Sequence, residues 1–86
     1  MITYYKLLDM LNRQGMTREQ LKNAAGLSSA TMTKISKQES VTLKTIDSIC
    51  RVMKCQPGDI LQYNDMSYED YATLQVERQL KNKENL

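Results

Sequence analysis

The stretch from Thr17 to Lys37, TREQLKNAAGLSSATMTKISK, decides the fold. It predicts two short helices joined by a tight turn at Gly26, where a helix end needs a left-handed residue that glycine adopts at little cost. Thr17 can cap the first helix, and Gln20, three residues later, completes a capping box. Ser28 can cap the second helix. Two capped helices around one glycine turn therefore form the centre of the predicted fold.

The second helix, residues 28–37, has two unlike faces. Met32 and Ile35, spaced i and i+3, point one way. The opposite face is small, polar and basic, so it can approach an anion without steric obstruction. This arrangement is typical of a helix-turn-helix whose second helix enters the DNA major groove. The alternative is an αα-hairpin within an ordinary helical bundle, but the order of caps, small residues and glycine favours the DNA-binding motif.

Candidate contact residues follow from the geometry of that face. We expect base-edge contacts from the residues on its centre, which are Ser29, Ala30, Thr33 and Lys34. Lys34 is the strongest candidate, because its ammonium can donate to guanine O6 and N7. Phosphate contacts are expected from residues at helix ends or margins, which are Arg18, Ser28, Lys37, Thr42 and Lys44.

Apolar spacing predicts three further helices in the first 63 residues. They cover residues 4–14, about 43–54 behind a Thr42 cap, and a short segment that begins at Pro57. In the first half of the motif, Leu21, Ala24 and Ala25 are expected to share a buried face. The inner face of the fourth helix is expected to comprise Leu43, Ile46, Ile49, Cys50 and Met53. No alternating strand pattern of useful length is present, so the fold class is all-α.

Residues 17–39 resemble the phage Cro/repressor-type (XRE) helix-turn-helix family, and the likeness continues through VTLKTIDSICRVMKCQPGDILQY, residues 41–63. The resemblance implies a five-helix DNA-binding domain of a small single-domain bacterial regulator, with a C-terminal helix added. Two residues depart from the family pattern. Arg18 stands where Gln commonly contacts a phosphate, and Lys22 stands where many members pack a small Ala. We expect Lys22 to direct its ammonium outward.

The chain divides at residue 63 into a helix-turn-helix DNA-binding domain, residues 1–63, and a C-terminal helical extension with a frayed end, residues 64–86. Apolar residues at helical spacing form a stripe on this extension: Tyr68, Tyr71, Ala72, Val76 and Leu80. The stripe either folds back on its own domain or pairs with a second copy. We predict a homodimer, since regulators of this kind usually read two half-sites.

Charge is unevenly distributed, although the net charge is only +2. Residues 17–44 contain five basic and two acidic residues, whereas residues 63–86 contain three basic and five acidic ones. A basic body with an acidic tail suits a polyanion on one side. The leading hypothesis is a sequence-specific regulator of double-stranded DNA. The alternative is a protein-interaction module, such as an antitoxin that binds its partner through the acidic tail.

Other classes of protein find little support. The chain contains no His for general base catalysis, and no Cys/His metal spacing or phosphate-binding glycine loop. We therefore expect no enzyme, no metal, no cofactor and no small-molecule substrate. Cys50 and Cys55 are expected to be reduced thiols of a cytoplasmic protein. No signal peptide or long apolar run suggests export or membrane insertion.

Overall fold

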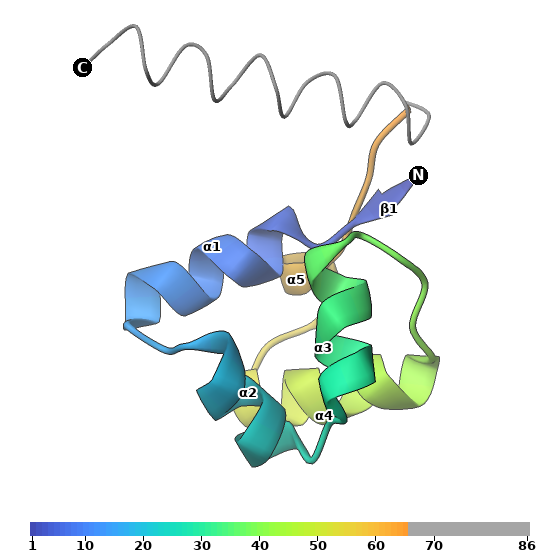
Figure 1. Ribbon diagram of the computed structural model, residues 1–86. Helices are drawn as coiled ribbons and strands as arrows, with labels where there is room; N and C mark the ends of the chain where they lie inside the picture. The colour runs from blue at the N-terminus through green and yellow to red at the C-terminus, as the bar shows by residue number, and fades with distance from the viewer. Residues whose placement is uncertain (66–86) are drawn as a thin grey trace, which may run out of the picture.

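The computed structural model describes residues 1–65, and within them it contains five helices and one small antiparallel sheet (Figure 1). The elements are β1 (Ile2–Thr3), α1 (Tyr5–Gln14), α2 (Arg18–Ala25), α3 (Ser29–Ser36), α4 (Leu43–Met53), α5 (Pro57–Ile60) and β2 (Gln62–Tyr63). The predicted all-α, five-helix domain is confirmed. The two-residue strands are an addition that the sequence pattern did not indicate.

Local capping forms the helix-turn-helix as predicted. The Gln20 amide donates to Thr17 Oγ1 at 3.0 Å, and Gln20 Oε1 accepts from the Thr17 amide at 2.8 Å. Gly26 ends α2 with a φ of 67°. The Ser28 hydroxyl then accepts the Thr31 amide at 3.1 Å, which starts α3. Because each of these bonds joins residues three positions apart, the sequence alone could specify them.

A single apolar core supports the motif. Helix α2 packs against α4, and α1 packs against α5. The apolar side chains that are completely buried come from all five helices: Leu7, Leu21, Ile35, Ile49 and Ile60. Among them, Ile35 is the residue through which α3 packs into the core of the domain. The position of α3 therefore depends on side chains from the whole domain.

Two expected core residues lie at the surface instead. Leu43 is 83% exposed, because it is the first residue of α4 and lies at the N-terminal edge of the core. Ala24 is also exposed, although Leu21 and Ala25 on the same helix are buried. The prediction of the inner face of α4 is confirmed at Ile46 and Ile49, which are buried. It is wrong at its first position, Leu43.

Four of the five helices are followed by a residue with a left-handed backbone. Gly15 and Gly26 have φ values of 66° and 67°, and two residues other than glycine, Gln38 and Lys54, have values of 61° and 53°. A Cβ in this region lies too close to the following carbonyl oxygen. Gln38 and Lys54 therefore carry strain that a glycine would relieve.

Replacing Lys54 by glycine is expected to stabilise the domain by about 0.5–1 kcal/mol. The change removes backbone strain of about 1–2 kcal/mol from the folded state. Glycine also gives the unfolded chain more conformational entropy, and this offsets about 0.4–1 kcal/mol of the gain. Lys54 suits the test because its side chain is exposed. Arg51→Gly, an exposed position inside the same helix, is the control and should destabilise by about 0.5–1 kcal/mol. Urea denaturation measures both, and equal losses of stability would contradict the strain at Lys54.

A buried polar contact joins the loop after α3 to the start of α1. Gln38 is only 5% exposed, and its Oε1 accepts the Tyr4 amide at 2.5 Å. The Tyr4 hydroxyl donates to the Glu39 carbonyl at 2.6 Å. Burial raises the pKa of this phenol, so it remains protonated and keeps its donor role at neutral pH. The contact joins residues 34 positions apart, so local sequence spacing does not indicate it.

The sheet brings the N-terminal residues beside the end of the domain. Ile2 pairs with Tyr63 and Thr3 with Gln62. The side-chain amide of Asn64 donates to the buried Thr3 hydroxyl at 2.7 Å, and the backbone amide of Asn64 donates to the Met1 carbonyl. Ile2 and Tyr63, which are opposite one another in the sheet, have exposed side chains. Of the predicted extension, residues 64–86, the structure describes only the first two positions. The predicted stripe from Tyr68 to Leu80 lies outside the described residues.

Cys50 and Cys55 are both free thiols, half-buried beside each other at the end of α4. Cys50 packs against the core without being fully enclosed by it. Burial raises the pKa of the Cys55 thiol, and the neighbouring Cys50 and Asp59 raise it further. A raised pKa keeps this thiol protonated, so Cys55 is a weak nucleophile.

Candidate nucleic-acid interface

Helix α3 separates its buried and exposed residues as its sequence predicts. Met32 and Ile35 face the core. The opposite face is open to solvent and contains Ser29, Ala30, Thr33 and Lys34, with Lys37 exposed at the C-cap. Nothing larger than a lysine stands on this face, so a double helix could approach the backbone of α3 closely.

The hydroxyl groups near this face differ in the hydrogen-bonding capacity that remains to them. Ser28 donates to Thr31 Oγ1 at 3.0 Å and also accepts the Thr31 amide, so capping occupies it. Thr33 donates its proton to the Ser29 carbonyl at 2.9 Å, which leaves its methyl group and lone pairs for other contacts. Ser29, by contrast, accepts a hydrogen bond from a lysine on the preceding helix.

That lysine is Lys22, and its orientation differs from the expectation. The ammonium was expected to point outward, but it lies 3.3 Å from Ser29 Oγ and 3.0 Å from Glu19 Oε1. Its side chain is only 19% exposed. Two acceptors on either side of the ammonium explain the position, since each satisfies one of its donors. Lys22 therefore connects α2 to the first residue of α3.

The beginning of α4 shares a hollow with α3. Thr42 caps α4 by accepting the Thr45 amide at 3.2 Å. A hollow of about 410 Å³ separates the two helices, and its lining comes from both of them and from the loop between: Thr31, Lys34, Ser40, Val41, Thr42 and Thr45. The structure thus brings Lys34, a predicted base contact, together with Thr42, a predicted phosphate contact.

Several residues of this hollow were missing from the sequence-based candidates. Thr31 and Thr45 each stand three residues after a capping residue, Ser28 and Thr42, and their hydroxyls bond to those of the caps. The same three-residue spacing that indicates the caps therefore also indicates Thr31 and Thr45. Ser40 had no local signal, because only the path of the loop places it in the hollow.

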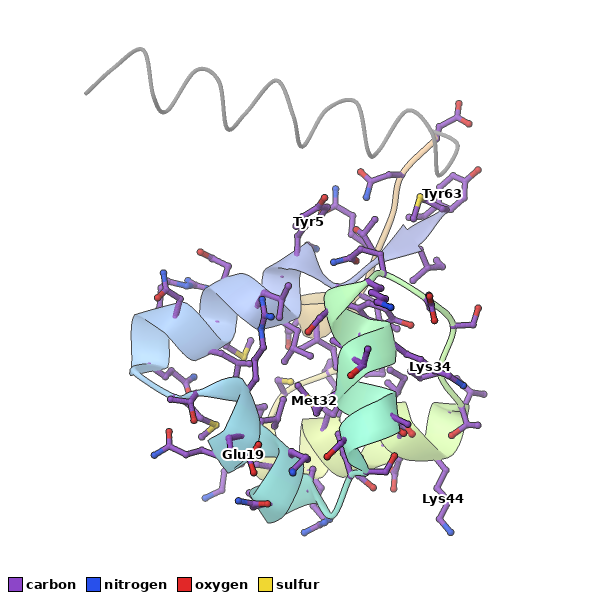
Figure 2. All side chains as sticks on the ribbon, viewed as in Figure 1. Tyr5, Glu19, Met32, Lys34, Lys44 and Tyr63 are labelled. Atoms are coloured by element: carbon purple, nitrogen blue, oxygen red, sulfur yellow. The ribbon has the colours of Figure 1, made fainter. Side chains whose placement is uncertain are left out.

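Positive charge on this side of the molecule is largely uncompensated. Within residues 1–65, Lys34, Lys37 and Lys44 take part in no ion pair, whereas Lys22 is paired with Glu19. Figure 2 shows Lys44 on the α4 side of the domain and Tyr63 at the opposite end, with Lys34 between them. A polyanion would therefore meet its strongest attraction along α3 and the beginning of α4.

Arg18 occupies a different position from the other predicted phosphate contacts. It is the first residue of α2 and lines a hollow of about 730 Å³ beside α1 and β2. Asp9, Asn12 and Thr17 share this lining. The structure therefore brings the α3 and α4 candidates together, while Arg18 stands at the other end of the motif.

No group of three or more Cys, Asp or Glu side chains in the described part of the chain could hold a metal ion. None of the helices in residues 1–65 has both the length and the apolar character to cross a membrane.

Comparisons with known proteins agree with this geometry. Residues 6–66 match the family model of the Cro/C1-type HTH DNA-binding domain. The chain is similar to YozG of Bacillus subtilis (strain 168), an uncharacterized HTH-type transcriptional regulator, with 36% identity over 56 residues, covering 63% of this chain and 67% of that protein. The crystal structure of the transcriptional regulator VanUg is also similar, with 34% identity and a TM-score of 0.69 over 71% of this chain and 81% of that one.

Proposed function

This chain belongs to the Cro/C1-type helix-turn-helix DNA-binding family, and from that premise we propose that it is a sequence-specific regulator of transcription. In this proposal α3, with its cap Ser28 and its C-cap Lys37, lies in the major groove of double-stranded DNA. The observation that carries the proposal is the exposed face of α3. Ser29, Ala30, Thr33 and Lys34 share it, while Met32 and Ile35 anchor the opposite face in the core.

The roles of these side chains follow from their chemistry. Lys34 donates to guanine O6 and N7, and Ala30 or the Thr33 methyl touches a thymine methyl. Thr33 reaches the groove with its methyl outward because its hydroxyl proton is bound to the Ser29 carbonyl. Lys34 therefore supplies the strongest discrimination between bases.

The phosphate contacts would come from either side of this face. The first turn of α4 has unpaired amide donors and the positive end of a helix dipole, with Lys44 beside them. Lys37 follows α3, and Arg18 and Ser28 stand near the starts of α2 and α3. Contacts at these helix ends would hold the protein in register without reading sequence.

Selection of bound duplexes from a random pool tests the proposed function. The full-length chain is expected to enrich one short sequence, and its affinity should fall steeply as salt is raised, because bound phosphates release counterions. The affinity for the enriched duplex and for a scrambled one is then measured over a salt series. A pool that stays random after repeated rounds, even at low salt, would contradict sequence-specific binding.

The same proposal includes a homodimer. Two copies could place their recognition helices about 34 Å apart on one face of DNA. Ile2 and Tyr63 support this, since they form an exposed apolar pair at the end of the domain that lies far from Lys44 (Figure 2). The apolar sequence stripe of Tyr68, Tyr71, Ala72, Val76 and Leu80 begins a few residues later. A partner bound at this end would leave α3 open.

Adding charge to the stripe is expected to separate the copies. The full-length chain should have twice the mass of the 9.9 kDa chain in light scattering, whereas Val76→Glu with Leu80→Glu should have the single mass, because charges cannot be buried unpaired. Lys81→Glu changes the net charge by the same two units, at a position that helical spacing places opposite the stripe, and should leave the dimer intact. A wild-type chain that remains a monomer at high concentration, both free and on DNA, would exclude the dimer.

A further inference from the structure

Lys22 holds a position that ordinary surface lysines do not. It stands on α2 four residues before Gly26, and its ammonium crosses the turn to reach the first residue of α3. One donor lies 3.3 Å from Ser29 Oγ and another lies 3.0 Å from Glu19 Oε1. The Lys22 side chain is mostly covered, although Glu19 is well exposed. The ammonium is therefore held at the edge of the candidate reading face.

This contact determines what the Ser29 hydroxyl can do next. A lysine ammonium has three donors and no acceptor, so Ser29 Oγ must accept in this bond. The hydroxyl proton of Ser29 remains free to donate. Ser28 and Thr33, the neighbouring hydroxyls of α3, have already given their protons to Thr31 and to the Ser29 carbonyl. Ser29 alone of these three can still donate outward.

From this arrangement we propose that Lys22 is a positioning residue that makes Ser29 a hydrogen-bond donor and thereby selects the base opposite it. The inference rests on the proposed function, in which α3 faces base edges. In the major groove, guanine presents O6 and N7, adenine presents N7 and thymine presents O4 as acceptors, whereas cytosine presents only the N4 donor. The Ser29 hydroxyl can donate to an acceptor of the first three bases. The amino donor of cytosine would instead have to share the Ser29 oxygen with the positively charged Lys22, so cytosine is disfavoured.

The competing role for Lys22 is a plain electrostatic one. Its third donor could contact a phosphate, which would strengthen binding to every sequence alike and add about one to the salt slope. The pairing with Glu19 could also be no more than a surface ion pair. Neither role involves the base opposite Ser29, so the profile of preferences along the site separates them from the proposal.

The experiment uses the full-length chain and the best duplex from the random-pool selection, together with each of its single base-pair replacements. Ser29→Ala first locates the pair that Ser29 faces, since discrimination there should fall by about three- to tenfold, the effect of one hydrogen bond. Lys22→Met, which keeps the length of the side chain without its charge, should lose discrimination at that same pair. The double variant should lose no more than Ser29→Ala alone, because the two residues act through one contact.

Glu19→Gln is the matched control, because it removes the charge that pairs with Lys22 and leaves the contact with Ser29. Its preference profile should equal that of the wild type. The inference is overturned if Lys22→Met weakens all duplexes equally and lowers the salt slope, or if its losses add to those of Ser29→Ala at a different pair. A wild-type chain that selects no sequence would overturn the proposed function, and this inference with it.

Discussion

Replacing Ile35 by alanine is expected to destabilise the domain by about 2–5 kcal/mol, the usual effect of removing a large aliphatic side chain from a closed core. Ile35 is 0% exposed and packs the inner face of α3 against the core. Native domains are stable by only about 5–15 kcal/mol, so this loss would remove a large part of the free energy of unfolding. Urea denaturation, followed by helical circular dichroism, measures the change.

Thr33→Ala is the control for Ile35→Ala, because it changes the same helix on its exposed side. It removes a hydrogen bond to the Ser29 carbonyl and no core contact, so its effect on stability should stay below about 1 kcal/mol. If the two variants lost stability equally, α3 would not be held by its inner face. The orientation of the candidate reading face would then need another explanation.

Replacing Lys34 by alanine is expected to weaken binding to the best duplex by about 1–3 kcal/mol and to relax the preference at one base pair. The physical reason is that Lys34 is exposed on the outer face of α3, and no ion pair in the described part of the chain holds its ammonium. Affinities for the best duplex, a scrambled duplex and single base-pair replacements, measured over a salt series, give both quantities.

Lys44→Ala is the matched comparison, since it removes the same charge from the beginning of α4. A phosphate contact there should make binding weaker for all sequences alike and reduce the salt slope by about one. The assignment of the two surfaces would be reversed if Lys34→Ala weakened both duplexes equally while Lys44→Ala changed the preferred sequence. Both lysines are exposed, so neither change should disturb folding.

Several features of the domain were readable from the sequence because they depend on residues close together in the chain. The Thr17 capping box, the Gly26 turn and the Ser28 and Thr42 caps all join residues five positions apart or fewer. The same holds for the two faces of α3, where helical spacing separates Met32 and Ile35 from the candidate base contacts. The resemblance to the Cro/repressor family added the order of the helices.

Other features depended on which elements the fold brings together, and local sequence spacing carries no information about such contacts. Leu43 has the spacing of an inner residue but stands at the end of α4 with its side chain in solvent. On an isolated helix Lys22 could pair only with Glu19, yet the turn at Gly26 also brings Ser29 within reach of its ammonium. Helical period predicts the direction of a side chain, whereas a neighbouring element decides whether anything lies in that direction.

The sequence by itself therefore determined the helices, their ends and the outward side of α3. Only the tertiary structure decided that Ser29 accepts a hydrogen bond from Lys22, that Gln38 is buried against Tyr4, and that Thr3 meets Asn64 across the sheet. The physical reason is the range of the interactions. Caps and helical faces are settled within one or two turns, but the contacts of Gln38 and Thr3 join residues 34 and 61 positions apart, and these form only when the whole core has closed.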